Sequence, residues 1–261
     1  MDKEVARERD SRPERILEGR KPLSSLRWLS KLTAVCLGLA GAPRRHCPLC
    51  AALIDAPGAY CPDCDVDLPR IAFACERCGV PMAEGMPRCA GCQHRPGSVD
   101  SSRIPFAYAY PLDRLVIGLK FSGDLTAAAE LASLLLPSVA EQPRPDCLMP
   151  VPLYPTRLRE RGYNQALEMA RPIAARLGLP IDLSSSVRVR PTAPQVGMNA
   201  RSRRRNVRGA FAVRTAMPCR HVAIIDDVVT TGSTVEELAK ALKRAGARYV
   251  QVWALARGGL R

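Results

Sequence analysis

The chain has 261 residues, of which 47% are hydrophobic and 25% are charged, and these fractions exclude a fibrous protein and a chain that is disordered throughout. Its length suits one large domain or two modest ones. With 39 Lys and Arg against 25 Asp and Glu, the net charge is +14, which favours anionic partners such as phosphates, nucleic acid or an acidic membrane surface. No run approaches the roughly 20 apolar residues that a transmembrane helix requires.

Residues 1–45 are expected to form a disordered or helical leader. Residues 1–22 are dense in charge, and residues 23–39 have the pattern of an amphipathic helix. The run LTAVCLGLAG at 32–41 is similar to the apolar core of a short signal peptide, but a long segment of mixed charge precedes it. The thiol-rich region that follows suits a reducing compartment, so the sequence favours a cytoplasmic location over export.

Eight of the 11 cysteines form four CxxC pairs, whose first members at 47, 61, 75 and 89 are separated by a constant step of 14 residues. Two intervening residues allow both sulfurs of a pair to contact one tetrahedral ion, and four thiolates favour zinc. Because sulfur fills every coordination position, the sequence predicts two structural zinc ions in a double zinc ribbon at residues 46–97. The expected ligands are Cys47, Cys50, Cys61, Cys64, Cys75, Cys78, Cys89 and Cys92.

The alternative for these cysteines is a disulfide framework or a set of redox CxxC motifs, which fits poorly without a convincing secretory context. The spacing leaves the partners open, since consecutive pairs give two hairpins and interleaved pairs give a cross-braced fold. Residues 46–97 hold four Arg against six Asp and Glu. That balance favours a scaffolding or docking role for the ribbons over nucleic-acid binding.

Beyond Gly97, apolar strands alternate with helical segments, which predicts an α/β fold with a parallel sheet flanked by helices in a second domain, residues 98–261. Gly178 and Gly246 are expected to end two of the helices, and Pro172 to bend the first of these. Strands are expected at 104–110, 147–151, 222–225 and 249–255, and helices at 125–136, 164–177 and 235–245.

The most informative segment is VAIIDDVVTTGST at residues 222–234, where an apolar strand ends in two carboxylates and a short loop opens the next helix. A glycine lets the loop approach a phosphate, while free N–H groups, hydroxyls and the helix dipole stabilise the anion. The carboxylates are placed to accept hydrogen bonds from sugar hydroxyls. The expected binding residues are Asp226, Asp227, Thr230, Thr231, Gly232, Ser233 and Thr234.

Simpler interpretations exist for each part of this segment, because Thr and Ser often only cap helices and acidic pairs also follow strands in nucleoside triphosphatases and response regulators. The sequence contains no G-x-x-x-x-G-K-[ST] motif, however, and a phospho-acceptor pair is expected near an early strand. The complete pattern resembles the signature of type I phosphoribosyltransferases, which bind 5-phosphoribosyl-1-pyrophosphate (PRPP).

Further segments resemble the ComF family, in which a double zinc ribbon precedes a type I phosphoribosyltransferase domain. The resemblance covers residues 46–257 and implies that fold, PRPP with magnesium as ligands, and a link to competence, DNA uptake and single-stranded DNA. The segments are the CxxC pairs, LKFSGD at 119–124, PVPLYPTRLRERGYNQA at 150–166, RPTAPQ at 190–195 and RRNVRGAF at 204–211.

By the same resemblance, residues 150–153 match the pyrophosphate loop and residues 190–206 match the mobile loop that closes over PRPP. The basic composition of the second segment, broken by Pro and Gly, suits a lid and suits a plain surface loop equally. The candidates for the pyrophosphate side of the site are Val151, Pro152, Leu153, Arg157, Arg161, Asn164 and Gln165.

Two functions are compatible with these features. The first is an enzyme that transfers the phosphoribosyl group, with magnesium and basic side chains stabilising the departing pyrophosphate; the sequence identifies neither its acceptor nor a catalytic residue. The second is a non-catalytic module that senses PRPP and binds single-stranded DNA through residues 157–208, where 12 basic residues accompany 3 acidic ones. Tyr163 is the only aromatic residue of that segment, so electrostatic recognition is expected.

Overall fold

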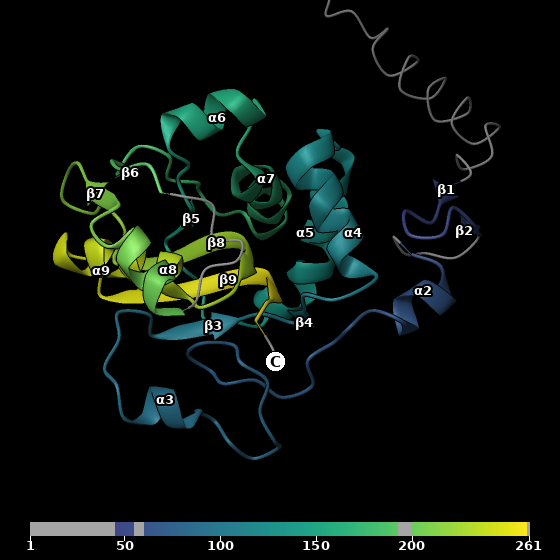
Figure 1. The fold of residues 1–261 in the computed structure, drawn as a ribbon, viewed down its shortest axis with the longest axis horizontal. Helices are drawn as coiled ribbons and strands as arrows, with labels where there is room; N and C mark the ends of the chain where they lie inside the picture. Colours follow the sequence, from purple (N-terminus) through teal and green to yellow (C-terminus); the bar gives the residue numbers. More distant parts are fainter. Residues whose placement is uncertain (1–44, 55–59, 193–199, 260–261) are drawn as a thin grey trace, which may run out of the picture. The chain divides into compact units, whose positions relative to one another are not determined.

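The computed structural model describes residues 45–54, 60–192 and 200–259 (Figure 1). Apart from Arg45, the expected leader lies outside the described residues, and so does its amphipathic helix. Among the helices that the structure describes, none is long and apolar enough to cross a bilayer.

A parallel sheet of five strands forms the centre of the described chain, in the order β3, β9, β8, β5, with β4 pairing to the far end of β9. This arrangement confirms the predicted parallel α/β sheet. The strands are β3 (Ser101–Arg103), β4 (Phe106–Ala107), β5 (Cys147–Pro150), β8 (His221–Val229) and β9 (Tyr249–Arg257).

Strand β8 is paired on both sides, and its side chains alternate between two hydrophobic cores. Ala223 and Ile225 belong to one core, together with residues of α5 (Thr126–Ala140) and α7 (Gln165–Leu177). Val222 and Ile224 belong to the other, with residues of α9 (Ser233–Arg244). Burial on both faces explains why β8 is almost uniformly apolar up to its carboxyl end, since each fully buried aliphatic side chain contributes about 1.5–3 kcal/mol.

Several expected boundaries are confirmed to within a few residues. Helix α7 begins after Asn164, whose Oδ1 accepts a hydrogen bond from the Ala166 N–H at 3.0 Å, and it ends at Gly178 with φ of 61°. Pro172 lies within α7 and does not end it. The sequence underestimated β8, because the strand continues through both carboxylates to Val229.

The single strand expected at residues 104–110 is wrong, because that range contains only the two-residue β4, and β3 ends before it at Arg103. Pro105 separates the two, and it lacks the N–H that a continuous ladder would require. The sequence also missed the short elements around the sheet, among which α4 lies beside α5 (Figure 1). These are α4 (Leu112–Ile117), a π-helix η1 (Gly118–Ser122), α6 (Pro155–Arg161), β6 (Ser186–Arg188), α8 (Ala200–Val207) and β7 (Phe211–Val213).

The cysteine-rich region contains little regular structure. Strands β1 (Arg45–His46) and β2 (Leu53–Ile54) form an antiparallel pair, and two single helical turns, α2 (Pro62–Val66) and α3 (Ala90–Gln93), each follow a cysteine directly. So short a set of elements buries few side chains. Metal coordination is the natural source of its stability.

Candidate functional site

The loop between β8 and α9 forms a small anion cradle. Gly232 adopts φ of 74°, a left-handed conformation that favours glycine, and it caps the N-terminus of α9. The Thr231 and Ser233 hydroxyls lie 2.8 Å apart, so the loop is held in shape by its own side chains. A hollow of about 30 Å³ is lined by Asp226 and by every residue from Val228 to Val235, which includes Thr230, Thr231, Gly232, Ser233 and Thr234.

The two carboxylates at the end of β8 lie in different environments. Asp227 is 3% exposed and forms an ion pair with Lys120 of η1. Burial alone would raise the pKa of Asp227, but the Lys120 ammonium outweighs it and holds that pKa below its usual range. Burial and the neighbouring Asp227 charge together raise the pKa of Asp226 well above its usual range. One carboxylate is therefore kept ionised, and its neighbour readily holds a proton.

Lys120 is the functional residue that sequence reasoning missed. It lies 107 positions before its partner (227 − 120), in the LKFSGD segment that carried part of the family resemblance but received no role. The signal that could have found it is a lysine in the otherwise apolar run VIGLKF, because a charge there needs a partner.

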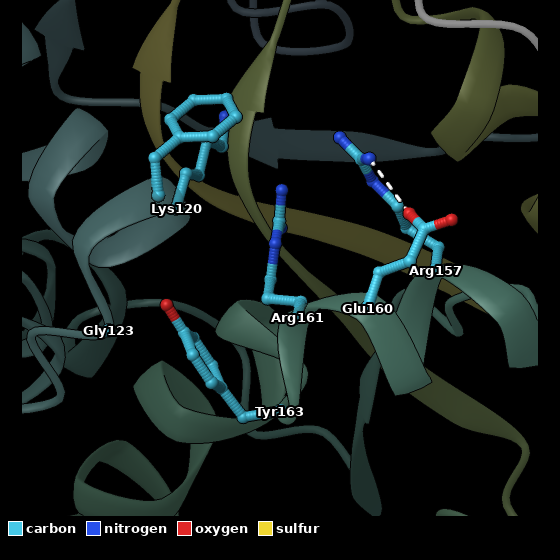
Figure 2. Close-up of a pocket in the computed structure, with 7 residues that line it drawn as sticks. Lys120, Gly123, Arg157, Glu160, Arg161 and Tyr163 are labelled. Atoms are coloured by element: carbon cyan, nitrogen blue, oxygen red, sulfur yellow. Dashed lines mark hydrogen bonds and ion pairs between the residues drawn. The ribbon is translucent and has the colours of Figure 1, made fainter.

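A basic pocket of about 200 Å³ opens beside Lys120. Figure 2 shows Arg157 and Arg161 reaching into it from α6, with Lys120 across from them. Glu160 offsets part of the charge by pairing with Arg157 at 3.2 Å, but both side chains are exposed and such pairs are weak. The pocket therefore remains cationic and suits an anion such as pyrophosphate.

The remaining pyrophosphate-side candidates do not line this pocket, although Gln165 bonds to one of its arginines. Gln165 is buried, and its Oε1 accepts a hydrogen bond from Arg161 Nη1 at 2.5 Å. Asn164 Nδ2 donates to the Val151 carbonyl at 3.0 Å, which ties the start of α7 to the loop after β5. In these contacts the two amides orient other candidate groups, while Pro152 and Leu153 line a separate cleft.

That cleft has a volume of about 550 Å³ and is bordered by the loop after β5, by α6 and by β6. Arg188 of β6 lines it, and burial lowers the pKa of this arginine while the Asp226 charge opposes the shift. Within the described chain, the buried atoms Arg188 Nε and Asp182 Oδ2 have no hydrogen-bond partner, and both residues line the cleft. Its walls are otherwise mostly apolar, with Leu158, Leu167 and Val189 among them. Much of its lining comes from the segment at 150–166, but no sequence motif marks the residues of β6.

Part of the segment expected to close over PRPP can be placed. Residues 193–199 of the range 190–206 lie outside the described residues, and α8 occupies most of the rest. Arg190 Nη1 donates to the Arg208 carbonyl at 2.6 Å, so the two ends of the segment are joined. Its role as a lid stays a prediction.

The eight CxxC cysteines form two four-sulfur clusters made from consecutive pairs, and this resolves the pairing that the sequence left open. Cys47, Cys50, Cys61 and Cys64 form one cluster, and Cys75, Cys78, Cys89 and Cys92 form the other, with the sulfurs of each within 4.8 Å of one another. The Sγ atoms of Cys50 and Cys61 are 3.6 Å apart and those of Cys78 and Cys89 3.7 Å. A tetrahedral ion with metal–sulfur bonds of about 2.3 Å needs about 3.8 Å, so both clusters fit zinc.

The thiols of these clusters differ in acidity, and burial raises the pKa of Cys64, Cys78 and Cys92. Burial alone would raise the pKa of Cys47, but backbone N–H donors in the knuckle outweigh it and bring the pKa to about 6. The same balance brings the pKa of Cys75 to about 7. The remaining described cysteines, Cys147 and Cys219, are free thiols, and Cys36 lies outside the described residues.

Comparison with known proteins places this geometry in a family. A family model described as "Phosphoribosyl transferase domain" matches residues 164–260. DNA utilization protein YhgH of Salmonella typhimurium is 41% identical over 189 residues, which cover 70% of this chain and 83% of that protein. Competence protein F of Haemophilus influenzae is 36% identical over 193 residues, covering 70% and 84%. Competence protein ComFC of Streptococcus pneumoniae is 27% identical over 173 residues, covering 65% and 75%.

The cluster geometry predicts two zinc ions per chain in reduced, freshly purified protein. Cys50→Ser and Cys78→Ser should each lower the zinc content to about one, because each removes one ligand from one cluster. Cys219→Ser, outside both clusters, is the matched control and should leave two. Elemental analysis gives the counts, and metal-free protein with mapped CxxC disulfides would contradict the assignment.

The environment of Asp226 predicts that Asp226→Asn stabilises the ligand-free protein near pH 7. Because the folded-state pKa is raised, the carboxyl destabilises the fold once the unfolded chain ionises, and this cost grows as the pH rises above about 4. Thermal unfolding should show a gain of a few degrees at pH 7 that disappears near pH 4. Glu160→Gln, at an exposed carboxylate, is the control, and a gain independent of pH would contradict the prediction.

Proposed function

Because the chain belongs to the ComF family, whose relatives are named as competence and DNA-utilization proteins, we propose that its phosphoribosyltransferase domain binds PRPP with magnesium at the carboxyl end of β8. The observation that carries the proposal is the adjacency of three parts. They are the anion cradle at Thr230–Thr234, the Asp226 and Asp227 pair, and the basic pocket around Lys120. PRPP has a phosphate, a ribose and a pyrophosphate that match them in order.

Each part supports one portion of the ligand. The loop N–H groups and the start of α9 suit the 5-phosphate, since a helix N-terminus stabilises an anion. Asp227, kept ionised by Lys120, is a hydrogen-bond acceptor for ribose hydroxyls. Arg157 and Arg161 suit the pyrophosphate, and arginine binds phosphate oxygens in a bidentate manner.

Magnesium is compatible with the groups present. Carboxylate and phosphate oxygens are the ligands it prefers, and Asp226 and PRPP supply both. When bound, the ion would neutralise charge on the pyrophosphate. Burial and the Asp227 charge raise the pKa of Asp226, and a cation bound beside this carboxyl would lower that pKa and favour loss of the proton.

The enzymatic form of the proposal adds a phosphoribosyl acceptor, which we assign to the cleft of about 550 Å³. Apolar walls with an unpartnered donor at Arg188 and an unpartnered acceptor at Asp182 suit a flat heterocycle that carries both kinds of hydrogen-bonding group. Release of pyrophosphate on mixing PRPP with candidate bases distinguishes this form from a non-catalytic sensor of PRPP.

The clusters complete the proposal as two structural zinc sites in a protein of the cytoplasm, where thiols stay reduced. Both are closed by four sulfurs and leave no position for a reacting water. We therefore assign to the ribbons a role in docking and in supporting the phosphoribosyltransferase domain.

A second function, binding of single-stranded DNA, is favoured by one specific observation. Phe121 is 70% exposed, and the Arg161 guanidinium lies 5.7 Å from its ring centre, beside the basic pocket. An exposed aromatic ring next to cations is the combination that binds unpaired bases together with their phosphates. Residues 157–208 predicted electrostatic recognition alone. Phe121, which lies outside that segment, adds base stacking to it.

PRPP binding is tested by replacing both carboxylates with amides of the same shape. Asp226→Asn with Asp227→Asn should weaken PRPP binding in the presence of magnesium on the order of 10- to 100-fold, because charge-assisted hydrogen bonds to the ribose are lost. Titration calorimetry measures the affinity. Glu168→Gln, at a carboxylate of α7 that pairs with Arg171 and does not line the pocket, should keep the parental affinity. Unchanged affinity in a folded double variant would refute the site.

DNA binding is tested with a labelled oligothymidylate and the exposed rings. Phe121→Ala should weaken binding on the order of 5- to 100-fold, and Phe121→Trp should restore it, since stacking needs a ring. The control is Phe73→Ala, another exposed phenylalanine at 46%, in the cysteine-rich region.

Arg157→Gln should reduce the salt dependence by about 0.7 in the slope of log affinity against log salt. Equal binding by Phe121→Ala and Phe73→Ala would exclude the stacking role.

A further inference from the structure

Arg257, at the carboxyl end of β9, joins the second cysteine cluster to the phosphate loop. Its side chain is buried, at 9% exposure, and makes three hydrogen bonds to backbone carbonyls. Nε donates to the Cys78 carbonyl at 3.1 Å, while Nη1 donates to Val229 at 3.0 Å and to Gly258 at 2.8 Å. Cys78 belongs to the cluster, and Val229 immediately precedes the loop.

The neighbouring backbone reinforces this end of the loop. The Gly258 N–H also donates to the Val229 carbonyl, at 2.8 Å. A Cβ atom at Gly258 would lie 3.0 Å from the Thr230 methyl carbon, so the backbone after Arg257 packs directly against the first loop residue. The position of Arg257 is therefore transmitted to Thr230 through backbone contacts.

The other end of the loop is held from the same region. Glu236, in the first turn of α9, accepts hydrogen bonds from the backbone N–H groups of Ser98 and Val99, the latter at 3.4 Å. Val99 in turn accepts from Arg77 Nε at 3.1 Å, and Arg77 is the residue before Cys78. Both flanks of the loop are thus fixed by groups that belong to, or lie next to, one zinc knuckle.

Electrostatic attraction also links Arg257 to the metal cluster. Four thiolates around a divalent ion carry a net charge of −2, and a buried charge needs a counter-ion. Burial lowers the pKa of the Arg257 guanidinium, and the negative charges of Cys78, Cys89 and Cys92 oppose that shift.

We propose that Arg257 is a positioning residue that couples metal occupancy of the Cys75, Cys78, Cys89 and Cys92 cluster to the conformation of the phosphate loop. With the metal bound, the knuckle fixes Arg257, and Arg257 fixes Val229. Without the metal, the four cysteines no longer share a central ion, and the Cys78 carbonyl that accepts from Nε is no longer held in place. Coupling of this kind is reciprocal, so an anion bound at the loop also strengthens metal binding.

The loop itself provides a test that needs no ligand. In full-length protein, hydrogen–deuterium exchange at residues 228–236 should accelerate on chelation of the zinc, by about 5- to 150-fold, while exchange in α7 changes little. Arg257→Gln should show the fast exchange at 228–236 with both zinc ions still bound. Glu236→Gln should loosen the other flank, and it keeps the proposal testable if Arg257→Gln fails to fold.

The matched control is Arg144→Gln. Arg144 likewise donates to two backbone carbonyls, Leu177 at 2.7 Å and Gly178 at 2.8 Å, but contacts no cysteine cluster. It should leave exchange at 228–236 unchanged. Arg257→Lys keeps the charge without the guanidinium fork and should show the same fast exchange at 228–236 as Arg257→Gln, which separates the anchoring role from the counter-ion role.

A second experiment depends on the proposed function, because it uses PRPP as the ligand. Zinc transfer to a colorimetric chelator, in excess magnesium, should slow for one of the two ions when PRPP is added, and Arg257→Gln should abolish the difference. Failure of PRPP to bind the parent would refute the proposed function and leave the exchange test standing. Equal exchange at 228–236 in the parent and both flank variants, with and without metal, would overturn the coupling.

Discussion

Parallel pairing on both sides of β8 is the constraint on which the rest of this structure depends. It joins β8 to β5 and β9 in one direction, so the carboxyl ends of all three strands meet at one edge of the sheet. The carboxylates of β8, the loop after β5 and Arg257 of β9 are brought together for that reason alone. Ligands of open parallel sheets bind at this edge, because loops and helix N-termini converge there.

The same pairing creates an electrostatic problem that the ion pair with Lys120 solves. A strand buried on both faces carries its last carboxylate into a poorly hydrated place, where an isolated charge would be expensive. Lys120 offsets that cost for Asp227, and Asp226 lowers it by holding a proton. The candidate site therefore has one fixed charge and one adjustable charge on adjacent residues, which a neutral pair or two paired aspartates would not provide.

Features that depend on contacts between neighbouring residues could be predicted from the sequence, whereas features that depend on contacts between distant segments could not. The strand, loop and helix at 222–234 and the end of α7 at Gly178 are encoded by neighbouring residues, so local patterns were enough. The CxxC spacing predicted the ligands but left their partners open, because the choice between hairpins depends on how distant segments fold. The pairing of Lys120 with Asp227 and the cleft at Arg188 arise from contacts across the fold. A lysine in an apolar run indicates that a partner is needed, but not which residue provides it. The break at Pro105 was readable, since a missing N–H is a local property.

The packing of Arg77 against Gly97 has a consequence for how freely the two regions can be exchanged. A Cβ atom at Gly97 would lie 1.2 Å from Arg77 Nη2, so the arginine occupies the space that any other residue at 97 would fill. Arg77 also donates to the Arg95 carbonyl at 2.5 Å, across the same turn of chain. The junction between the two regions is therefore closely packed and is not a flexible linker. A chimera that joins the ribbons of a relative to this phosphoribosyltransferase domain would need to carry the arginine and the glycine together. A break point between them would separate two residues that pack against each other.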